Sequence, residues 1–352
     1  MRFRLAFASA LTIVVLMGSV AFAGNTANTA QDGEGNEAWI LQNQIGEDGN
    51  TAFVTQIGNY NKLETFEYNT DGPALQEGSG NWLDVVSIGD SNLVKVRQYG
   101  SNNTGNVYQG EDSGSHGATA YLEQYNADNL GTIRQNGGAV GYGSVAGIYQ
   151  YGMGSEADID QDGTENAAST YQYDESHFAG IEQNGELNNA LVHQYGYGNH
   201  ALVLQDGAYN YSSTNQSAQG NSAEVAQTGE YNESLVNQYA DGNEAVVAQT
   251  GYNNYSVVDQ YGNGGVSGVQ QNGDSQRADI VQYGYGNESY IFQTEGYNNH
   301  ALVSVNGQHN LAEITQGGNM NQGYVYQNGL ENSAAVSQIG TGNLTRVVQN
   351  AY

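Results

Sequence analysis

The pattern of apolar and polar positions repeats every eleven residues along most of the chain. Between Asn188 and Gln194, alternate positions carry Asn, Ala, Val and Gln, and the residues between them vary. The same order recurs at 199–205, 221–227, 232–238 and 332–338, always with a small residue at the alanine position. Because alternate side chains of a strand point to one face, each unit predicts a short β-strand with these four side chains inside. The variable residues predict an outer face that meets solvent or a neighbouring molecule.

Glutamine marks the length of the repeat. It occupies every eleventh position from Gln150 to Gln293 without exception. After one inserted residue the series continues through Val305, Gln316, Gln327, Gln338 and Gln349, and before Gln150 it runs back through Gln135, Gln124, Gln109, Gln98, Ser87, Gln76, Glu67, Gln56 and Gln44. Counted from 44 to 349, these positions make 28 units. Glycine follows two residues after most glutamines, where a tight turn needs a positive φ.

The residue after the glutamine shows a second period, of 22 residues. In every other unit it is tyrosine, with Ser217 as the gap in the series Tyr151, Tyr173, Tyr195, Tyr239, Tyr261 and Tyr283. Successive strands therefore differ, and two strands make one turn of a coil. Two sheets can pack their Ala/Val stripes against each other, whereas a flat meander leaves both faces exposed. We predict an all-β, two-sided β-solenoid of about 14 rungs, each with two strands and 22 residues, and with uncapped ends.

Interior amides must find hydrogen-bond partners. Identical amides stacked along an axis bond to the copies above and below, and a slip of one residue would turn Asn, Val and Gln outward together. We expect these amides to carry register and assembly; the residues assigned to this ladder are Gln183, Gln194, Gln205, Gln227, Gln238, Gln249, Gln338, Gln349, Asn188, Asn199, Asn221, Asn232, Asn243 and Asn343. The tyrosine column is interpreted either as packing or as an adhesive ladder between filaments or to a surface.

Some intervals between glutamines are irregular. Four residues are added between Gln109 and Gln124 and again between Gln135 and Gln150, and we expect both insertions in turns, where a coil tolerates them. The single proline, Pro73, lies in the one shortened interval, from Glu67 to Gln76. We expect this interval to be the weakest rung.

Residues 1–23 have the order of a secretory signal, with two arginines, an apolar run and then small residues. We interpret 24–43 as a short N-terminal segment with a partial repeat and 44–352 as the repeat domain, with no membrane span in the mature chain. The formal net charge of −29 repels phosphate backbones and argues against nucleic-acid binding. Because the chain has no cysteine, disulfides do not stabilise it.

Candidate chemistry is weak in this sequence. The six histidines lack a recurrent ligand spacing and are interpreted as surface residues. Glu156, Asp158 and Asp160 place three carboxylates on one outward face, and 110–114 forms an acidic turn, but neither contains a full calcium-loop pattern. We interpret both as solvated surface. We therefore assign no catalytic residue, metal ligand or cofactor.

The repeat Gln-x-Gly-x-x-Asn-x-Ala-x-Val-x-Gln, seen from Gln183 to Gln194, resembles the curlin repeat of bacterial curli fibre subunits. The resemblance covers about 300 residues. It implies a secreted subunit that polymerises into functional amyloid of the biofilm matrix, an extracellular, pilus-like fibre at the bacterial cell surface. It also implies self-association as a homopolymer, a homologous nucleator or major subunit, and an outer-membrane export channel as partners. The chain departs from the family in having about fourteen double-strand repeats and no long Gly/Asn-rich export segment after Ala23.

The last unit, Asn343 to Gln349, is a full repeat close to the end of the sequence. We expect the edge of its strand to be open to a further subunit, with Gln44 and Asn50 in the first complete rungs at the other end. A monomeric β-solenoid adhesin or surface-binding module is the alternative, including an ice-binding protein, although outward threonine is sparse. A β-helical polysaccharide enzyme is a further alternative, but most turns here are too short to build a cleft.

Overall fold

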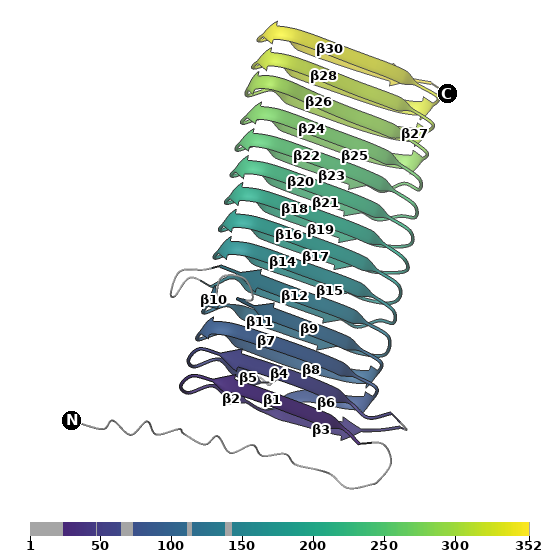
Figure 1. Cartoon of the computed structure of the whole chain (residues 1–352). Helices are drawn as coiled ribbons and strands as arrows, with labels where there is room; N and C mark the ends of the chain where they lie inside the picture. The colour runs from purple at the N-terminus through teal and green to yellow at the C-terminus, as the bar shows by residue number, and fades with distance from the viewer. Residues whose placement is uncertain (1–23, 47, 65–72, 111–114, 138–142, 352) are drawn as a thin grey trace, which may run out of the picture.

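The chain winds into a coil of two parallel β-sheets that face each other (Figure 1). The computed structural model describes residues 24–351 except 47, 65–72, 111–114 and 138–142. Segment 1–23, the predicted signal, therefore lies outside the described residues. The predicted two-sided β-solenoid of about 14 turns with 22 residues per turn is confirmed. Among the residues described, no helix is long and apolar enough to cross a bilayer.

One sheet, called sheet A, contains the first strand of each turn. Its strands are β1 (Thr26–Asp32), β4 (Thr51–Ile57), β7 (Trp82–Asp90), β9 (Thr104–Gln109), β12 (Leu130–Asn136), β14 (Glu156–Thr164), β16 (Phe178–Glu186), β18 (His200–Ala208), β20 (Ser222–Glu230), β22 (Glu244–Tyr252), β24 (Val266–Asp274), β26 (Glu288–Tyr297), β28 (Leu311–Asn319) and β30 (Ser333–Thr341), with the short β10 (Ser115–His116) beside β7.

The other sheet, sheet B, contains the second strand of each turn. Its strands are β2 (Glu37–Ala38), β3 (Ile40–Gln44), β5 (Lys62–Glu64), β6 (Ala74–Ser79), β8 (Leu93–Ser101), β11 (Thr119–Gln124), β13 (Val145–Gln150), β15 (Ala167–Gln172), β17 (Asn189–Gln194), β19 (Tyr211–Gln216), β21 (Glu233–Gln238), β23 (Tyr255–Gln260), β25 (Arg277–Tyr285), β27 (His300–Gln308), β29 (Gln322–Leu330) and β31 (Leu344–Asn350).

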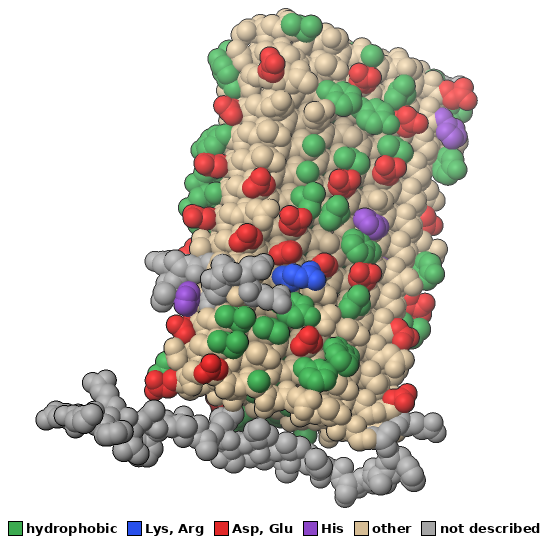
Figure 2. Space-filling view, viewed as in Figure 1, with side chains coloured by type: hydrophobic (Ala, Val, Ile, Leu, Met, Phe, Trp, Pro, Cys, Tyr) green, Lys and Arg blue, Asp and Glu red, His purple; other side chains and the backbone are tan. Residues whose placement is uncertain are grey.

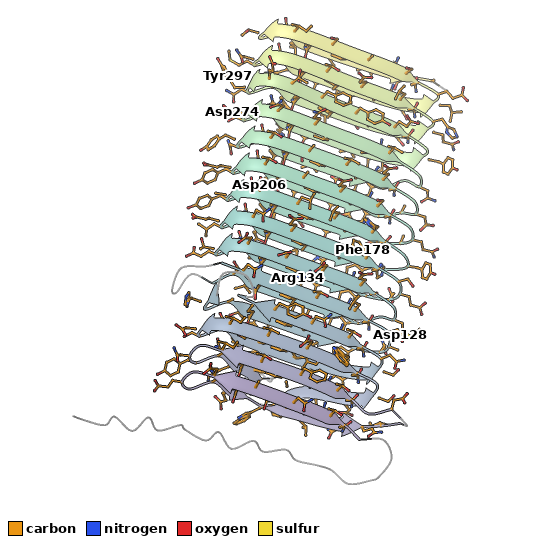
Figure 3. The ribbon with its side chains drawn as sticks, in the orientation of Figure 1. Asp128, Arg134, Phe178, Asp206, Asp274 and Tyr297 are labelled. Carbon is orange, nitrogen blue, oxygen red and sulfur yellow. The ribbon has the colours of Figure 1, made fainter. Side chains whose placement is uncertain are left out.

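The core is the narrow space between the two sheets. Side chains alternate between this space and the outer faces (Figure 3), and the inward Ala179, Ile181, Ala190 and Val192 are at most 2% exposed. Neighbouring strands pair in parallel with matching positions of successive turns, so that Ala179 lies beside Ala201. Each fully buried Val or Ile contributes roughly 1.5–3 kcal/mol, and stacking equal residues keeps the two sheets at one separation.

The two intervals with four added residues contain segments 111–114 and 138–142, which lie outside the described residues. They fall between β9 and β11, where β10 forms, and between β12 and β13. The single insertion after Gln293 produces a register shift where β24 pairs with β26. In all three places the inward positions resume in register on the next strand, so the coil keeps its register across the added residues.

The interval from Glu67 to Gln76 is not a repeat unit of its own, and the expectation that it is the weakest rung stays a prediction. Both β5 and β6 pair with β8, and the segment 65–72 between them, which includes Glu67, lies outside the described residues. The chain from Gln56 to Gln76 is thus one long unit and not two short ones. Pro73 stands directly before β6, at the start of a strand, where its missing N–H is tolerated.

Candidate assembly site: amide ladders and the outermost turns

A row of buried glutamines runs along each sheet. In sheet B, Nε2 of Gln194 donates to Oε1 of Gln216 at 2.8 Å, and in sheet A Nε2 of Gln183 donates to Oε1 of Gln205 at 2.7 Å. The same nitrogen also donates to a carbonyl of the opposite sheet, as from Gln194 to Phe178 O at 2.8 Å. The glutamines therefore satisfy one another between turns and join the two sheets within a turn.

Asparagines form a second kind of ladder where each strand begins. The backbone N–H and Nδ2 of Asn210 both donate to Oδ1 of Asn188 at 3.0 Å, and Nδ2 also donates to Gly229 O at 2.9 Å. The asparagine ladder thus ties each turn to its neighbours through side chain and backbone together.

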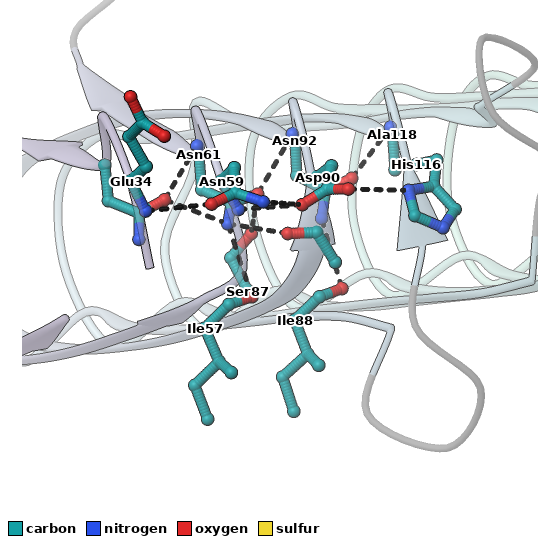
Figure 4. Close-up of polar contacts among 12 residues, drawn as sticks. Glu34, Ile57, Asn59, Asn61, Ser87, Ile88, Asp90, Asn92, His116 and Ala118 are labelled. Atoms are coloured by element: carbon teal, nitrogen blue, oxygen red, sulfur yellow. Dashed lines mark hydrogen bonds and ion pairs between the residues drawn. The ribbon is translucent and has the colours of Figure 1, made fainter. Parts of the chain in front are cut away.

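Figure 4 shows this ladder near the N-terminal end, with Asn61 Oδ1 accepting from the backbone N–H of Asn92 at 3.1 Å. Asn92 Oδ1 accepts in turn from the N–H of Ala118. Alanine has no amide to continue the series, so the asparagine ladder is interrupted at this turn.

The assigned ladder residues lie in these rows. Those that are buried are Gln183, Gln194, Gln205, Gln227, Gln238, Gln249, Gln338, Asn188, Asn199, Asn221, Asn232 and Asn243. Gln349 is half-buried and Asn343 is exposed, because both belong to the last turn. Gln349 Oε1 accepts from Gln327 Nε2 at 2.9 Å, and Asn343 N–H donates to Asn321 Oδ1 at 3.1 Å. Their role in assembly is taken up below as a proposal.

The first glutamines of the ladders were predicted incorrectly. Gln42 pairs in register with Gln76 and donates to its Oε1 at 2.8 Å, while Gln44 lies opposite Gly78. In sheet A, Gln31 donates to Gln56 Oε1 at 2.6 Å. Gln44 is not a ladder residue, because β3 pairs with β6 in a register that places Gln42, two residues earlier, beside Gln76. Asn50 is fully buried, as expected.

The tyrosine column forms and is longer than predicted. Rings of Tyr151, Tyr173 and Tyr195 stack with centroids 5.1 and 4.7 Å apart, and Tyr99 and Tyr125 extend the stack from below at 5.0 and 5.3 Å. Beyond Ser217, the rings of Tyr239, Tyr261 and Tyr283 stack at 4.8 and 4.7 Å. Tyr99 and Tyr125 were missed because the inserted residues after Gln109 and after Gln135 both break the 22-residue period.

The interpretation of all six histidines as surface residues was wrong for His177. This side chain is 2% exposed and occupies an asparagine position, where Nδ1 accepts from the backbone N–H of Asn199 at 3.2 Å. Burial lowers the pKa of His177, with a smaller opposing effect of the hydrogen bond to Tyr173 O. The sequence indicates this inward position, because His177 lies eleven residues from Asn166 and eleven from Asn188.

The acidic side chains lie on the outer faces of the two sheets, and Figure 2 shows those on one of these faces. Asp158 forms an ion pair with Arg134 at 3.2 Å, and burial raises the pKa of the neighbouring Asp160 carboxyl. In the part of the chain that the structure describes, no group of three or more His, Asp or Glu is placed to hold a metal ion. Most of the acidic turn, 111–114, lies outside that part.

Fold and ladders together define a structural repeat protein, a β-solenoid with amides in its interior. The family model of the curlin associated repeat matches residues 178–207, 218–251, 273–307 and 307–340. These repeats, within 178–340, indicate a curlin-family protein. The curlin repeat family is structural and not catalytic. No curated protein matches the chain.

Proposed function

We propose that this chain is a secreted structural subunit that polymerises end to end into extracellular, curli-like amyloid fibres at the bacterial cell surface. There it supports adhesion and the biofilm matrix. The curlin repeats and the β-solenoid fold suggest a curli-type fibre subunit, and the family suggests an extracellular location. A homologous nucleator or major subunit and an outer-membrane export channel are the partners that this role would require.

The observation that carries the proposal is that β30 and β31 each pair with a strand on one side only among the described residues. Val325 and Gln327 of β29 are buried, whereas Val347 and Gln349, one turn further, are only half-buried. Leu344 and Ile339 beside them are 70% and 85% exposed. A strand added to β30 and β31 would cover these side chains and receive the backbone hydrogen bonds of both edges.

The direction of the glutamine ladder favours head-to-tail joining. Where two glutamines are stacked, Nε2 of the first donates toward the C-terminal end, as from Gln327 to Gln349, and Oε1 of the second accepts from the N-terminal side. Stacking the first turn of one subunit on the last turn of another would let Gln338 and Gln349 donate to Gln31 and Gln42. Two C-terminal ends placed together would bring donors against donors, which the ladder cannot satisfy.

Replacing Gln338 and Gln349 by leucine tests the proposal. Freshly desalted chain should sediment as growing polymer and bind thioflavin T, and the double variant should assemble more slowly, because its last ladder position cannot donate. Asn350→Leu is the matched control, since Asn350 lies on the outer face of the same strand. Equal kinetics for all three chains would contradict the role of the ladder. Wild-type chain that stays monomeric would support the adhesin alternative instead.

A further inference from the structure

One outward carboxylate of sheet B is almost completely buried. Glu123 of β11 is 8% exposed, although its position points away from the core. It lies in register between Arg97 of β8 and Tyr149 of β13, and Arg97 Nη1 is 3.2 Å from Oε1. The carboxylate is therefore held in place by a cation and covered by aromatic rings.

Two stacked tyrosines donate to this one carboxylate. The hydroxyl of Tyr125 donates to Glu123 Oε1 at 2.9 Å, and that of Tyr151 donates to Oε2 at 3.0 Å. Their rings are 5.3 Å apart with an interplanar angle of 21°. The backbone N–H groups of both tyrosines are bonded to the next turn at 2.8 and 2.9 Å, so the backbone that carries the two phenols is held by the sheet.

Removing an electron from a neutral phenol makes its hydroxyl strongly acidic, so the proton leaves with or after the electron when a base is in reach. Burial and the charge of Glu123 raise the pKa of Tyr151, and burial also raises that of Tyr125, so neither ring reacts readily as a phenolate. A carboxylate that already accepts a hydrogen bond from the hydroxyl is a base within reach of the proton. The stack from Tyr99 to Tyr195 offers further rings in contact with this pair.

We propose that Tyr125 and Tyr151, with Glu123 as their proton acceptor, form a redox-active tyrosine site. A one-electron oxidant, such as the oxidised haem of a peroxidase, takes one electron from either phenol. The phenol O–H bond breaks, its proton forms an O–H bond on Glu123, and a neutral phenoxyl radical remains. Charge and atoms balance, because the oxidant gains the electron and the carboxylate gains the proton. This site is independent of whether the chain polymerises.

The chain contains its own comparison sites. Tyr239, Tyr261 and Tyr283 stack as closely, with centroids 4.8 and 4.7 Å apart, and are 43–47% exposed. The structure shows no carboxylate accepting from these three hydroxyls among the described residues. If exposure alone determined reactivity, this more exposed stack would be oxidised first, which is the opposite of the order that the proposal expects.

The experiment uses the full soluble chain and photogenerated tris(bipyridine)ruthenium(III), a one-electron oxidant. Radicals are captured with a nitroso spin trap and located by peptide mass spectrometry. We expect adducts at Tyr125 and Tyr151 to form at least about tenfold faster than at Tyr239, Tyr261 and Tyr283. A positioned base usually accelerates a proton transfer by about 100-fold or more, so a tenfold difference is a conservative threshold. Equal rates at the two stacks, or faster reaction of the exposed stack, would overturn the proposal.

Glu123→Gln keeps the shape of the side chain and removes the base. Its adducts at 125 and 151 should fall to the rate of the exposed stack, while circular dichroism remains that of the parent. The matched control is Asp84→Asn, because Asp84 accepts from the hydroxyl of Tyr108 at 3.2 Å in sheet A. That control should leave 125 and 151 unchanged. Undiminished adducts in a folded E123Q chain would equally overturn the assignment.

Discussion

Gln327 is paired in register with Val305, and this pairing breaks the glutamine ladder of sheet B. Oε1 of Gln327 is buried and has no hydrogen-bond partner among the described residues. On the other side of the break, Nε2 of Gln282 donates to Ser289 Oγ at 2.8 Å, since valine offers no acceptor. A buried acceptor left unsatisfied costs roughly 1–3 kcal/mol.

Val305→Gln should repair this break. The new amide can accept from Gln282 and donate to Gln327, as glutamines do in the turns before and after, so the free energy of unfolding should rise by about 1 kcal/mol. Urea unfolding followed by circular dichroism measures the change. Val303→Gln is the control, because this inward position has Ile280 and Val325 as its neighbours. It should lose about 2 kcal/mol or more; similar losses in both variants would rule out the ladder explanation.

Thr214 presents the opposite case, a polar group in an apolar row. It lies in register between Val192 and Val236, and its buried Oγ1 has no partner among the described residues. Thr214→Val keeps the shape and removes the unsatisfied hydroxyl, so we expect about 1 kcal/mol of added stability. Thr315→Val, on the outer face of β28, should change stability by less than about 0.5 kcal/mol. A destabilised T214V chain would show that the hydroxyl is satisfied in solution.

Gly207 illustrates why glycine recurs two residues after glutamine. Its φ is +121°, and a Cβ there would lie 2.1 Å from the carbonyl oxygen of Gly229 on the next turn. Gly207→Ala should therefore lose at least about 1–3 kcal/mol from backbone strain, with the clash in addition. At Gly220, φ is +63° and a Cβ would meet nothing within 4 Å, so Gly220→Ala should be tolerated much better. Thermal unfolding of the two chains compares them directly, and equal losses would refute the steric argument.

The sheets, their register and most of the interior could be predicted because the repeat encodes them locally. Asn188, Ala190, Val192 and Gln194 each specify an inward side chain by type, and their spacing alone fixes the strand. The first turn was less accessible, because Gln42 and Gln76 are 34 residues apart and an inserted segment interrupts the strand between them. Counting back from Gln76 and Gln56 therefore did not reach Gln42, although Gln31 and Gln42 are themselves eleven residues apart and carried the signal.

The cluster around Glu123 could not be predicted from the repeat at all. Its members come from three successive turns, and an insertion lies between each turn and the next, so the eleven-residue spacing does not relate them. The outward positions also have no common residue type. Only the register of β8, β11 and β13 brings Arg97, Glu123 and Tyr151 together. The inward code thus determines the fold, whereas the chemistry of the outer face depends on which variable residues the coil happens to stack.

His177 should make the stability of the coil depend on pH. Because burial lowers its pKa below the ordinary value of 6.5, the unfolded chain binds a proton at this side chain more readily than the native chain. Above about pH 6.5 this histidine is neutral in both states and does not lower the free energy of unfolding. As the pH falls through that value toward the lower native pKa, the unfolded chain takes up the proton first and the free energy of unfolding decreases. Urea midpoints of the parent chain should therefore decrease from about pH 7.5 to about pH 5.5. His177→Asn, which restores the residue of neighbouring repeats, should remove most of this decrease, while His193→Asn on the outer face should retain it. A midpoint that falls as steeply in H177N as in the parent would assign the pH dependence to other groups.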